Sequence, residues 1–294
     1  MEVCRILGTI GLVIVAIAAC IHPSIAQDDP VIEAARAAET ELKARVGVAI
    51  IDSASNRTWL YHADERFAMA STSKAVTCAA LLAKGEEVLR KQVLIRESDI
   101  LDYAPVTKSM VGRSIEASDL CAIALRTSDN TAINKVLDVL GGPQSVTGFV
   151  RSIGDETTRL DRNEPSLNEA RPNDPRDTTT PRSMAATLSK LLLGSALNER
   201  ARNQLTNWLV SNEVGGPLLR AGIPADWRIA DRTGAGGFGT RGAIAVMWPS
   251  NRAPIVAAVY LTETEASMEK RNAAIAAIAK AVATIVTSEH RIAK

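Results

Sequence analysis

Histidine is scarce in this chain of 294 residues, which contains only three. His22 lies in an N-terminal apolar segment, so only His62 and His290 remain for the rest of the chain. Two isolated histidines do not supply a zinc site with normal ligand spacing, and they leave little room for a Ser-His-Asp triad. We therefore predict no metal and no other cofactor. If the chain is a hydrolase, lysine and carboxylate side chains must transfer its protons.

An excess of charge is also missing. The 34 lysines and arginines nearly balance the 33 aspartates and glutamates, which leaves a formal net charge of +1. There is no basic run, and the few aromatic residues are not interleaved with cations, so we predict no nucleic-acid partner. Hydrophobic residues make up 46% of the chain, which is enough for a substantial folded core.

The first 26 residues differ from the rest. Arg5 precedes an apolar run over residues 6–19, and the small residues Ser24 and Ala26 follow it. This pattern predicts a secretory signal that is cleaved after Ala26, and therefore a periplasmic or secreted protein. The run is too short to predict a membrane span. An alternative is a lipoprotein signal, because Cys20 follows small residues in "IAAC".

Removal of the leader leaves two of the four cysteines, Cys78 and Cys121. An even pair in an exported protein favours a disulfide, which would close a loop of 43 residues. The alternative is two buried free thiols.

The order of hydrophobic patterns predicts an α+β fold. Helical spacing covers residues 30–44 and 268–286, and β-branched runs cover 45–52, 58–63, 227–236, 241–248 and 254–262. We expect a five-stranded antiparallel sheet with both terminal helices on one face and an inserted helical subdomain. The predicted division is a signal over 1–26 and one catalytic domain over 27–294. Its α/β part comprises residues 27–66 and 211–294, and its helical part comprises 67–210.

Ser71 and Lys74 stand at the start of a predicted helix in "STSKAVTCAALLAKG". Residues three apart share one helix face, so the lysine amine can reach the serine oxygen. A helix N-terminus also favours negative charge, and a serine nucleophile needs an adjacent base. The alternative is that Ser71 only caps the helix.

Three further motifs follow in order. They are "SDN" at Ser128 to Asn130, "RNEPSLN" at Arg162 to Asn168, and "DRTGAG" at Asp231 to Gly236. Each has an ordinary structural interpretation, such as a turn in which Asp129 caps the next helix. The second motif lies in a long polar loop, residues 159–180, which we call the Glu164 loop. Loops of this length within compact domains are usually functional or disordered.

Together the four motifs resemble those of the class A serine β-lactamases, over nearly all of the chain after the leader. The resemblance implies that Ser71 is the acylated nucleophile and Lys74 its neighbouring base. It implies that Ser128 passes a proton to the leaving nitrogen, and that Glu164 and Asn168 hold the deacylating water.

The resemblance also implies a set of substrate contacts. Asn130 would bind the substrate amide, the N–H groups of Ser71 and Ala235 would form the oxyanion hole, and Tyr103 would lie at the rim of the cleft. The substrate carboxylate would meet Arg232, Thr233, Gly234 and Arg241. The family further implies a Cys78–Cys121 disulfide and an Arg162–Asp177 salt bridge.

Arg232 departs from the family's usual lysine. Arginine there resembles the carbenicillin-hydrolysing branch, and it can anchor a carboxylate but cannot relay a proton. The implied protein is a monomer that hydrolyses penicillins, carbenicillin and early cephalosporins, confers antibiotic resistance and binds β-lactamase inhibitors. Two alternatives share most of the motifs. They are a D-alanyl-D-alanine peptidase or penicillin-binding protein, and a β-lactam sensor domain.

Overall fold

The computed structural model describes residues 29–292. The predicted signal segment over residues 1–26, with its cleavage point after Ala26 and the alternative lipidation at Cys20, lies outside the described residues. The described chain opens with helix α1 (Pro30–Leu42). The Asp29 side chain accepts a hydrogen bond from the Val31 N–H, and Pro30 occupies the first turn, where its missing N–H costs nothing.

A five-stranded antiparallel sheet forms the middle layer, in the order β2-β1-β9-β8-β7. Its strands are β1 (Arg45–Asp52), β2 (Thr58–Tyr61), β7 (Arg228–Ala235), β8 (Arg241–Trp248) and β9 (Ile255–Thr262). Strand β1 pairs with β9 from Arg45↔Thr262 to Asp52↔Ile255. This pairing joins the two ends of the chain around the helical insertion, and it confirms the predicted α+β fold.

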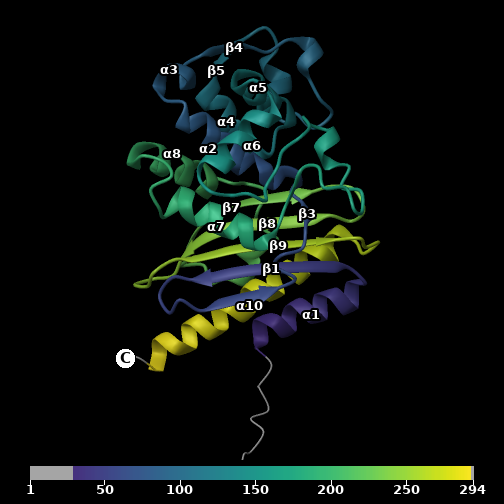
Figure 1. Ribbon diagram of the computed structural model, residues 1–294, viewed down its shortest axis with the longest axis vertical. Coiled ribbons are helices and arrows are strands. Elements are labelled where there is room, and N and C mark those ends of the chain that lie inside the picture. Colours follow the sequence, from purple (N-terminus) through teal and green to yellow (C-terminus); the bar gives the residue numbers. More distant parts are fainter. Residues whose placement is uncertain (1–28, 293–294) are drawn as a thin grey trace, which may run out of the picture.

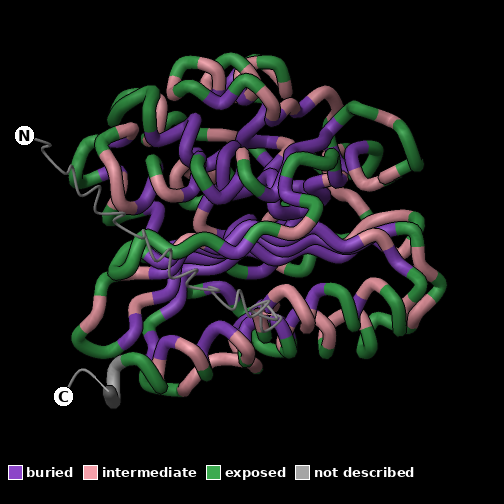
Figure 2. Tube along the Cα trace, turned by 60° about the horizontal axis from the view of Figure 1, so that its bottom comes forward, coloured by how far each residue is buried: buried purple, intermediate pink, exposed green. Residues whose placement is uncertain are grey.

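Both faces of the sheet are buried (Figure 2). Side chains alternate between the faces with the period of two that strands impose. Val46, Val48 and Ile50 of β1 pack with α1 and with α10 (Met268–Ile292), below the sheet in Figure 1. Ala49 of β1 belongs instead to the core cluster under the helices above the sheet. The two terminal helices therefore cover one face, as predicted.

The helical layer occupies the other face (Figure 1). It contains the short η1 (Ala70–Thr72), α2 (Ser73–Ala83), α3 (Glu86–Leu89), α4 (Ala117–Thr127), α5 (Asn130–Leu140), α6 (Pro143–Ser152), α7 (Pro181–Leu192) and α8 (Glu199–Val210). The short α9 (Leu219–Gly222) instead packs against α10 on the face that the terminal helices cover. Short 3₁₀ turns are η2 (Glu97–Asp99), η3 (Thr107–Met110) and η4 (Ser166–Asn168). None of the helices within residues 29–292 combines the length and the apolar character that a membrane crossing requires.

Two small ladders in this region were not predicted. They pair β3 (Phe67–Ala68) with β6 (Thr178–Thr179), and β4 (Gln92–Leu94) with β5 (Ser114–Glu116). Strands of two or three residues are too short to show an alternating pattern in the sequence. The β3–β6 ladder ties the end of the Glu164 loop to the chain that precedes Ser71.

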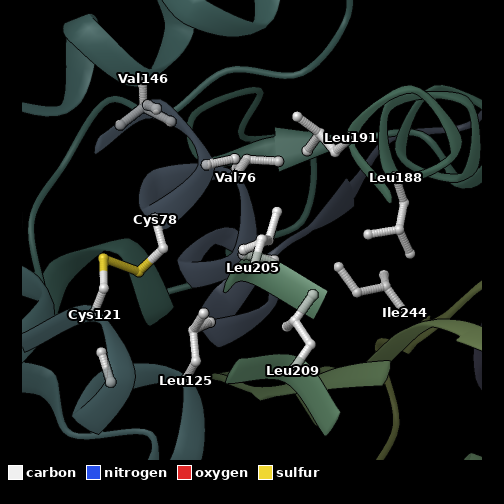
Figure 3. Packing of buried hydrophobic residues seen from close by; sticks show 14 of the residues in the cluster. Val76, Cys78, Cys121, Leu125, Val146, Leu188, Leu191, Leu205, Leu209 and Ile244 are labelled. Carbon is white, nitrogen blue, oxygen red and sulfur yellow. A yellow bond between two sulfur atoms is a disulfide. The ribbon is translucent and has the colours of Figure 1, made fainter. Parts of the chain in front are cut away.

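Cys78 and Cys121 form a disulfide between α2 and α4, which confirms the predicted bond (Figure 3). Both cysteines are buried, and their Cα atoms lie 5.6 Å apart. The bond lies among apolar side chains of the helical layer, such as Leu125 and Val76. It anchors the helix that carries Lys74 to the helix that precedes Ser128.

Replacing both cysteines with alanine is expected to lower the free energy of unfolding by at most about 4 kcal/mol, because the bond closes a 43-residue loop. The helical layer retains a large core, so we expect activity to persist. Chemical denaturation compares the two stabilities, and thiol titration of the unfolded protein checks the bond itself. Two titratable thiols without reductant would contradict the disulfide.

Candidate active site

Ser71 and Lys74 meet Glu164 in a buried group. Lys74 Nζ lies 2.6 Å from Ser71 Oγ, 2.5 Å from Glu164 Oε1 and 2.9 Å from Asn130 Oδ1. The Lys74 and Glu164 side chains are fully buried. Burial lowers the pKa of Lys74 to about 8, against the opposing attraction of Glu164. The Lys74 amine can therefore change its charge near neutral pH, which a group that transfers protons requires.

Ser71 is not a helix cap. It lies in the 3₁₀ turn η1, ahead of α2, and its side chain makes no capping hydrogen bond to that helix. Its hydroxyl contacts Lys74 and Ser128 instead, with 3.2 Å between the oxygens of Ser71 and Ser128. The position of Ser71 ahead of α2 and its contact with Lys74 follow from the local sequence, but its contact with Ser128 does not follow from local spacing.

Side chains on α5 and in the Glu164 loop hold Glu164 in place. Asn134 Nδ2 donates to the Glu164 carbonyl at 2.8 Å, and the Glu164 N–H donates to Asn134 Oδ1 at 2.9 Å. Asn168 Nδ2 donates to Glu164 Oε2, and Asn168 Oδ1 is a buried acceptor without a partner among the described residues. The Glu164–Pro165 peptide is cis. The carboxylate is therefore fixed from both the main chain and the side chain.

Sequence reasoning missed Asn134. It lies four residues after Asn130 on α5, so both side chains belong to one helix face. That spacing is the signal that could have identified it.

The "SDN" motif has a structural and a chemical part. Asp129 caps α5 by accepting from the Ala132 N–H, and it also accepts from Val106 N, Thr107 N and Thr107 Oγ1. This confirms the capping interpretation of Asp129. The residues on either side, Ser128 and Asn130, contact Ser71 and Lys74.

Strand β7 passes directly against the turn that holds Ser71. A Cβ atom on Gly234 would lie 2.7 Å from the Met69 carbonyl and 3.1 Å from the Ser71 nitrogen, so only glycine fits there. Thr233 and Arg232 precede it on the strand and are buried, and Ala235 follows it. The predicted strand triplet therefore lies beside the nucleophile.

Two buried arginines lie on the adjacent strands β7 and β8. Arg232 is fully buried, its Nη1 lies 3.5 Å from Asn212 Oδ1, and its Nε and Nη2 have no acceptor among the described residues. Arg241, on β8, donates to Asn272 Oδ1 at 2.7 Å and to the Gly234 carbonyl at 3.1 Å. Burial lowers the pKa of each guanidinium to about 10. Tyr103 is half-exposed, and its carbonyl accepts from the Asn130 N–H.

Comparison with known proteins identifies the family. Residues 30–286 match the model of the "Beta-lactamase enzyme family". Beta-lactamase PSE-4 of Pseudomonas aeruginosa is 46% identical over 87% of this chain and 90% of its own length. For Beta-lactamase CTX-M-8 of Citrobacter amalonaticus, the identity is 49% over 88% of this chain and 90% of its own length. A solved ancestral class A β-lactamase superposes with a TM-score of 0.84 at 50% identity, and covers 87% of this chain and 99% of that structure.

The chain belongs to the class A serine β-lactamases.

The Glu164 loop of this β-lactamase is held by charged pairs at its base. Arg162 Nε lies 2.5 Å from Asp177 Oδ2, which is the ion pair that the resemblance implied. The N–H groups of Asp161 and Arg162 donate to Asp177 Oδ1 at 2.8 and 2.9 Å. Asp161 in turn accepts from the Asp177 N–H at 2.9 Å. Bonds across the neck of the loop keep Glu164 directed toward Lys74.

Proposed function

We propose that this β-lactamase hydrolyses β-lactams by forming an acyl-enzyme on Ser71 and releasing it with a water that Glu164 activates. The observation that carries this proposal is the buried contact of Lys74 Nζ with both Ser71 Oγ and Glu164 Oε1. A serine is a weak nucleophile until an adjacent base accepts its proton. Here one amine links the nucleophile to a carboxylate.

In the acylation step, Ser71 Oγ attacks the lactam carbonyl carbon and forms an ester as the carbon–nitrogen bond breaks. The serine proton passes to Lys74, or through water to Glu164. Ser128 delivers its own proton to the departing nitrogen, and the proton taken from Ser71 then returns to Ser128. The N–H groups of Ser71 and Ala235 stabilise the negative oxygen of the intermediate. Loss of one such donor typically costs about 2.7–4 kcal/mol in hydrolases.

In the deacylation step, Glu164 takes a proton from water, and the resulting hydroxide attacks the ester carbon. Ser71 then recovers its proton as the opened product leaves. Asn168 supports this role, because its Oδ1 is a buried acceptor without a donor in the described part of the chain. A penicillin-binding protein retains its acyl group, so it does not require residues such as Glu164 and Asn168 that would hold a deacylating water.

Nitrocefin turnover tests the proposal. We expect many turnovers per molecule of protein. A single stoichiometric burst would instead indicate a penicillin-binding protein or a sensor domain, and no reaction would exclude all three.

We also propose that Arg232 and Arg241 bind the ring carboxylate that β-lactam substrates share. The Nε and Nη2 groups of Arg232 are buried and have no acceptor among residues 29–292, so their hydrogen-bonding capacity is not used within this part of the protein. Carbenicillin carries an additional side-chain carboxylate. The substrates we propose are accordingly penicillins, carbenicillin and early cephalosporins.

We expect carbenicillin to be hydrolysed with a kcat/KM within about tenfold of the benzylpenicillin value, a barrier difference of about 1.4 kcal/mol or less. Arg232→Lys should lower kcat/KM for carbenicillin more than for benzylpenicillin, since lysine replaces a planar fork with a point charge. The measurement is the ratio of the two kcat/KM values at fixed salt.

Arg228→Lys is a matched control, because Arg228 lies at the exposed far end of β7 and stacks on Trp248. The control should leave the ratio unchanged. If Arg232→Lys also leaves it unchanged, Arg232 anchors only the shared carboxylate.

We further propose that the protein is exported to the periplasm or secreted, as a monomer beginning at Gln27. The intact mass of the mature protein checks the cleavage point, and a lipid-modified Cys20 would contradict it. Light scattering checks the monomer.

A further inference from the structure

The backbone immediately before Ser71 is strained. Ala70 has a φ of +44°, in the left-handed region that residues with a Cβ atom rarely adopt, and it is fully buried. Such a conformation persists only where surrounding contacts enforce it. Because Ser71 is the next residue, whatever holds Ala70 also sets the direction of the Ser71 hydroxyl and N–H.

A hydroxyl of the same turn supplies one of these contacts. The Thr72 N–H and Thr72 Oγ1 both lie within hydrogen-bond distance of the Met69 carbonyl, at 3.0 and 2.8 Å. Thr72 Oγ1 also lies 3.0 Å from the Tyr260 hydroxyl. The threonine proton is donated to Met69, so the tyrosine must be the donor in the second bond. Burial raises the pKa of Tyr260, which keeps the phenol protonated as this role requires.

The sheet is built to let the Tyr260 ring reach the turn. Tyr260 lies on the central strand β9, and its cross-strand neighbours are Gly47 on β1 and Gly242 on β8. A Cβ atom on Gly242 would lie 2.7 Å from the Tyr260 ring and 3.5 Å from Thr72 Cγ2. Glycine weakens a strand interior and often marks a close approach. Here Gly242 leaves the space through which the ring passes.

A second aromatic ring fixes Tyr260 from the side. Phe67 stacks on it, with 6.2 Å between ring centroids and 19° between ring planes. A Cβ atom on Gly47 would clash with the Phe67 ring, so the other neighbouring glycine accommodates the stacking partner. Packing alone would be served by phenylalanine at position 260. The hydroxyl is the part of the side chain that packing does not explain.

We propose that Tyr260 is a positioning residue for acylation: its hydroxyl, acting through Thr72, holds the turn that sets the Ser71 oxygen and N–H toward the substrate. The bond chain runs from the centre of the sheet to the Met69 carbonyl, immediately before the strained Ala70. It does not include Glu164 or Asn168, so activation of the deacylating water should stay intact. The larger effect should fall on acylation, in which the Ser71 hydroxyl is the attacking group, whereas deacylation depends on this turn only through the Ser71 N–H. This inference rests on the proposed acyl-enzyme function.

The test measures acylation and deacylation rates with nitrocefin by stopped flow, together with thermal stability. Tyr260→Phe removes only the hydroxyl, and we expect acylation to slow about tenfold, or about 1.4 kcal/mol in the barrier, with a clearly smaller decrease in the deacylation rate. Thr72→Val should have the same effect, and Thr72→Ser, which keeps the hydroxyl, should restore the wild-type rate. Since both single changes break one chain, the double variant should be no slower than either.

Tyr61→Phe is the matched control. It removes a tyrosine hydroxyl that bonds to Glu39, in the contact of β2 with α1 on the other side of the sheet. Its acylation rate should equal that of the wild type.

A normal acylation rate in Tyr260→Phe, whatever its melting temperature, would overturn the inference. The inference would also be overturned if the acylation barrier of the double variant rose by the sum of the increases in Tyr260→Phe and Thr72→Val. If the wild type itself forms no acyl-enzyme, the proposed function fails instead.

Discussion

Replacing Glu164 with alanine is expected to leave a protein that acylates and then stalls. After mixing with benzylpenicillin, mass spectrometry should show the protein plus one drug mass, persisting for minutes. Deacylation should slow by about 10²–10⁴-fold, the usual contribution of a positioned general base. The expectation follows from the buried position of Glu164, its bond from Asn168 and the fixed geometry that Asn134 imposes on its main chain.

Ser166→Ala is the control for this experiment. Ser166 lies two residues further along the same loop, in η4, and is exposed. It should deacylate as the wild type does. Free, unmodified Glu164→Ala protein that forms product at the normal rate would remove Glu164 from the proposed role.

Replacing Lys74 with methionine should slow acylation by about 10²–10⁴-fold, because the nearest proton acceptor of Ser71 is lost. Methionine keeps most of the volume of the buried side chain. Stopped-flow acylation with nitrocefin measures the effect. Lys135→Met is the matched control, since Lys135 is also a buried lysine but pairs with Asp99 and Asp138. The control should lose stability and keep its acylation rate.

The pH dependence distinguishes Lys74 from Glu164 as the acylation base. Burial is the main cause that lowers the pKa of Lys74, to about 8, and the Glu164 carboxylate is the largest cause that raises it. Removing that carboxylate should therefore move the lysine pKa further down. Only the neutral amine accepts a proton, so acylation in Glu164→Ala should rise with pH to a plateau, with a midpoint below that of Lys74 in the wild type.

A flat acylation profile in Glu164→Ala between about pH 5 and 9 would show that Lys74 does not titrate as the base. An acylation rate of Lys74→Met equal to that of the wild type would lead to the same conclusion by an independent measurement. Either outcome would leave the serine proton to another acceptor.

The sequence by itself determined the features of this protein that depend on neighbouring residues alone. Runs of β-branched and aromatic residues predicted the five strands of the main sheet, because a preference for extended backbone is a property of each run alone. The motif order predicted the family, and the predicted cleavage after Ala26 implied one remaining pair of cysteines that could bond. The three-residue spacing of Ser71 and Lys74 was enough to predict their contact, since it depends only on local helical geometry.

Only the tertiary structure decided which distant groups meet. Glu164 reaches Lys74 across 90 positions, because the Glu164 loop folds back through charged bonds that have no periodic signature. The Nε and Nη2 groups of Arg232 are buried without an acceptor among the described residues, which the position of Arg232 on a predicted strand did not indicate. Tyr260 reaches Thr72 across 188 positions, through a gap that a glycine on the adjacent strand leaves open. Such contacts depend on strand register and on how layers pack, and neither is encoded in any single stretch of the chain.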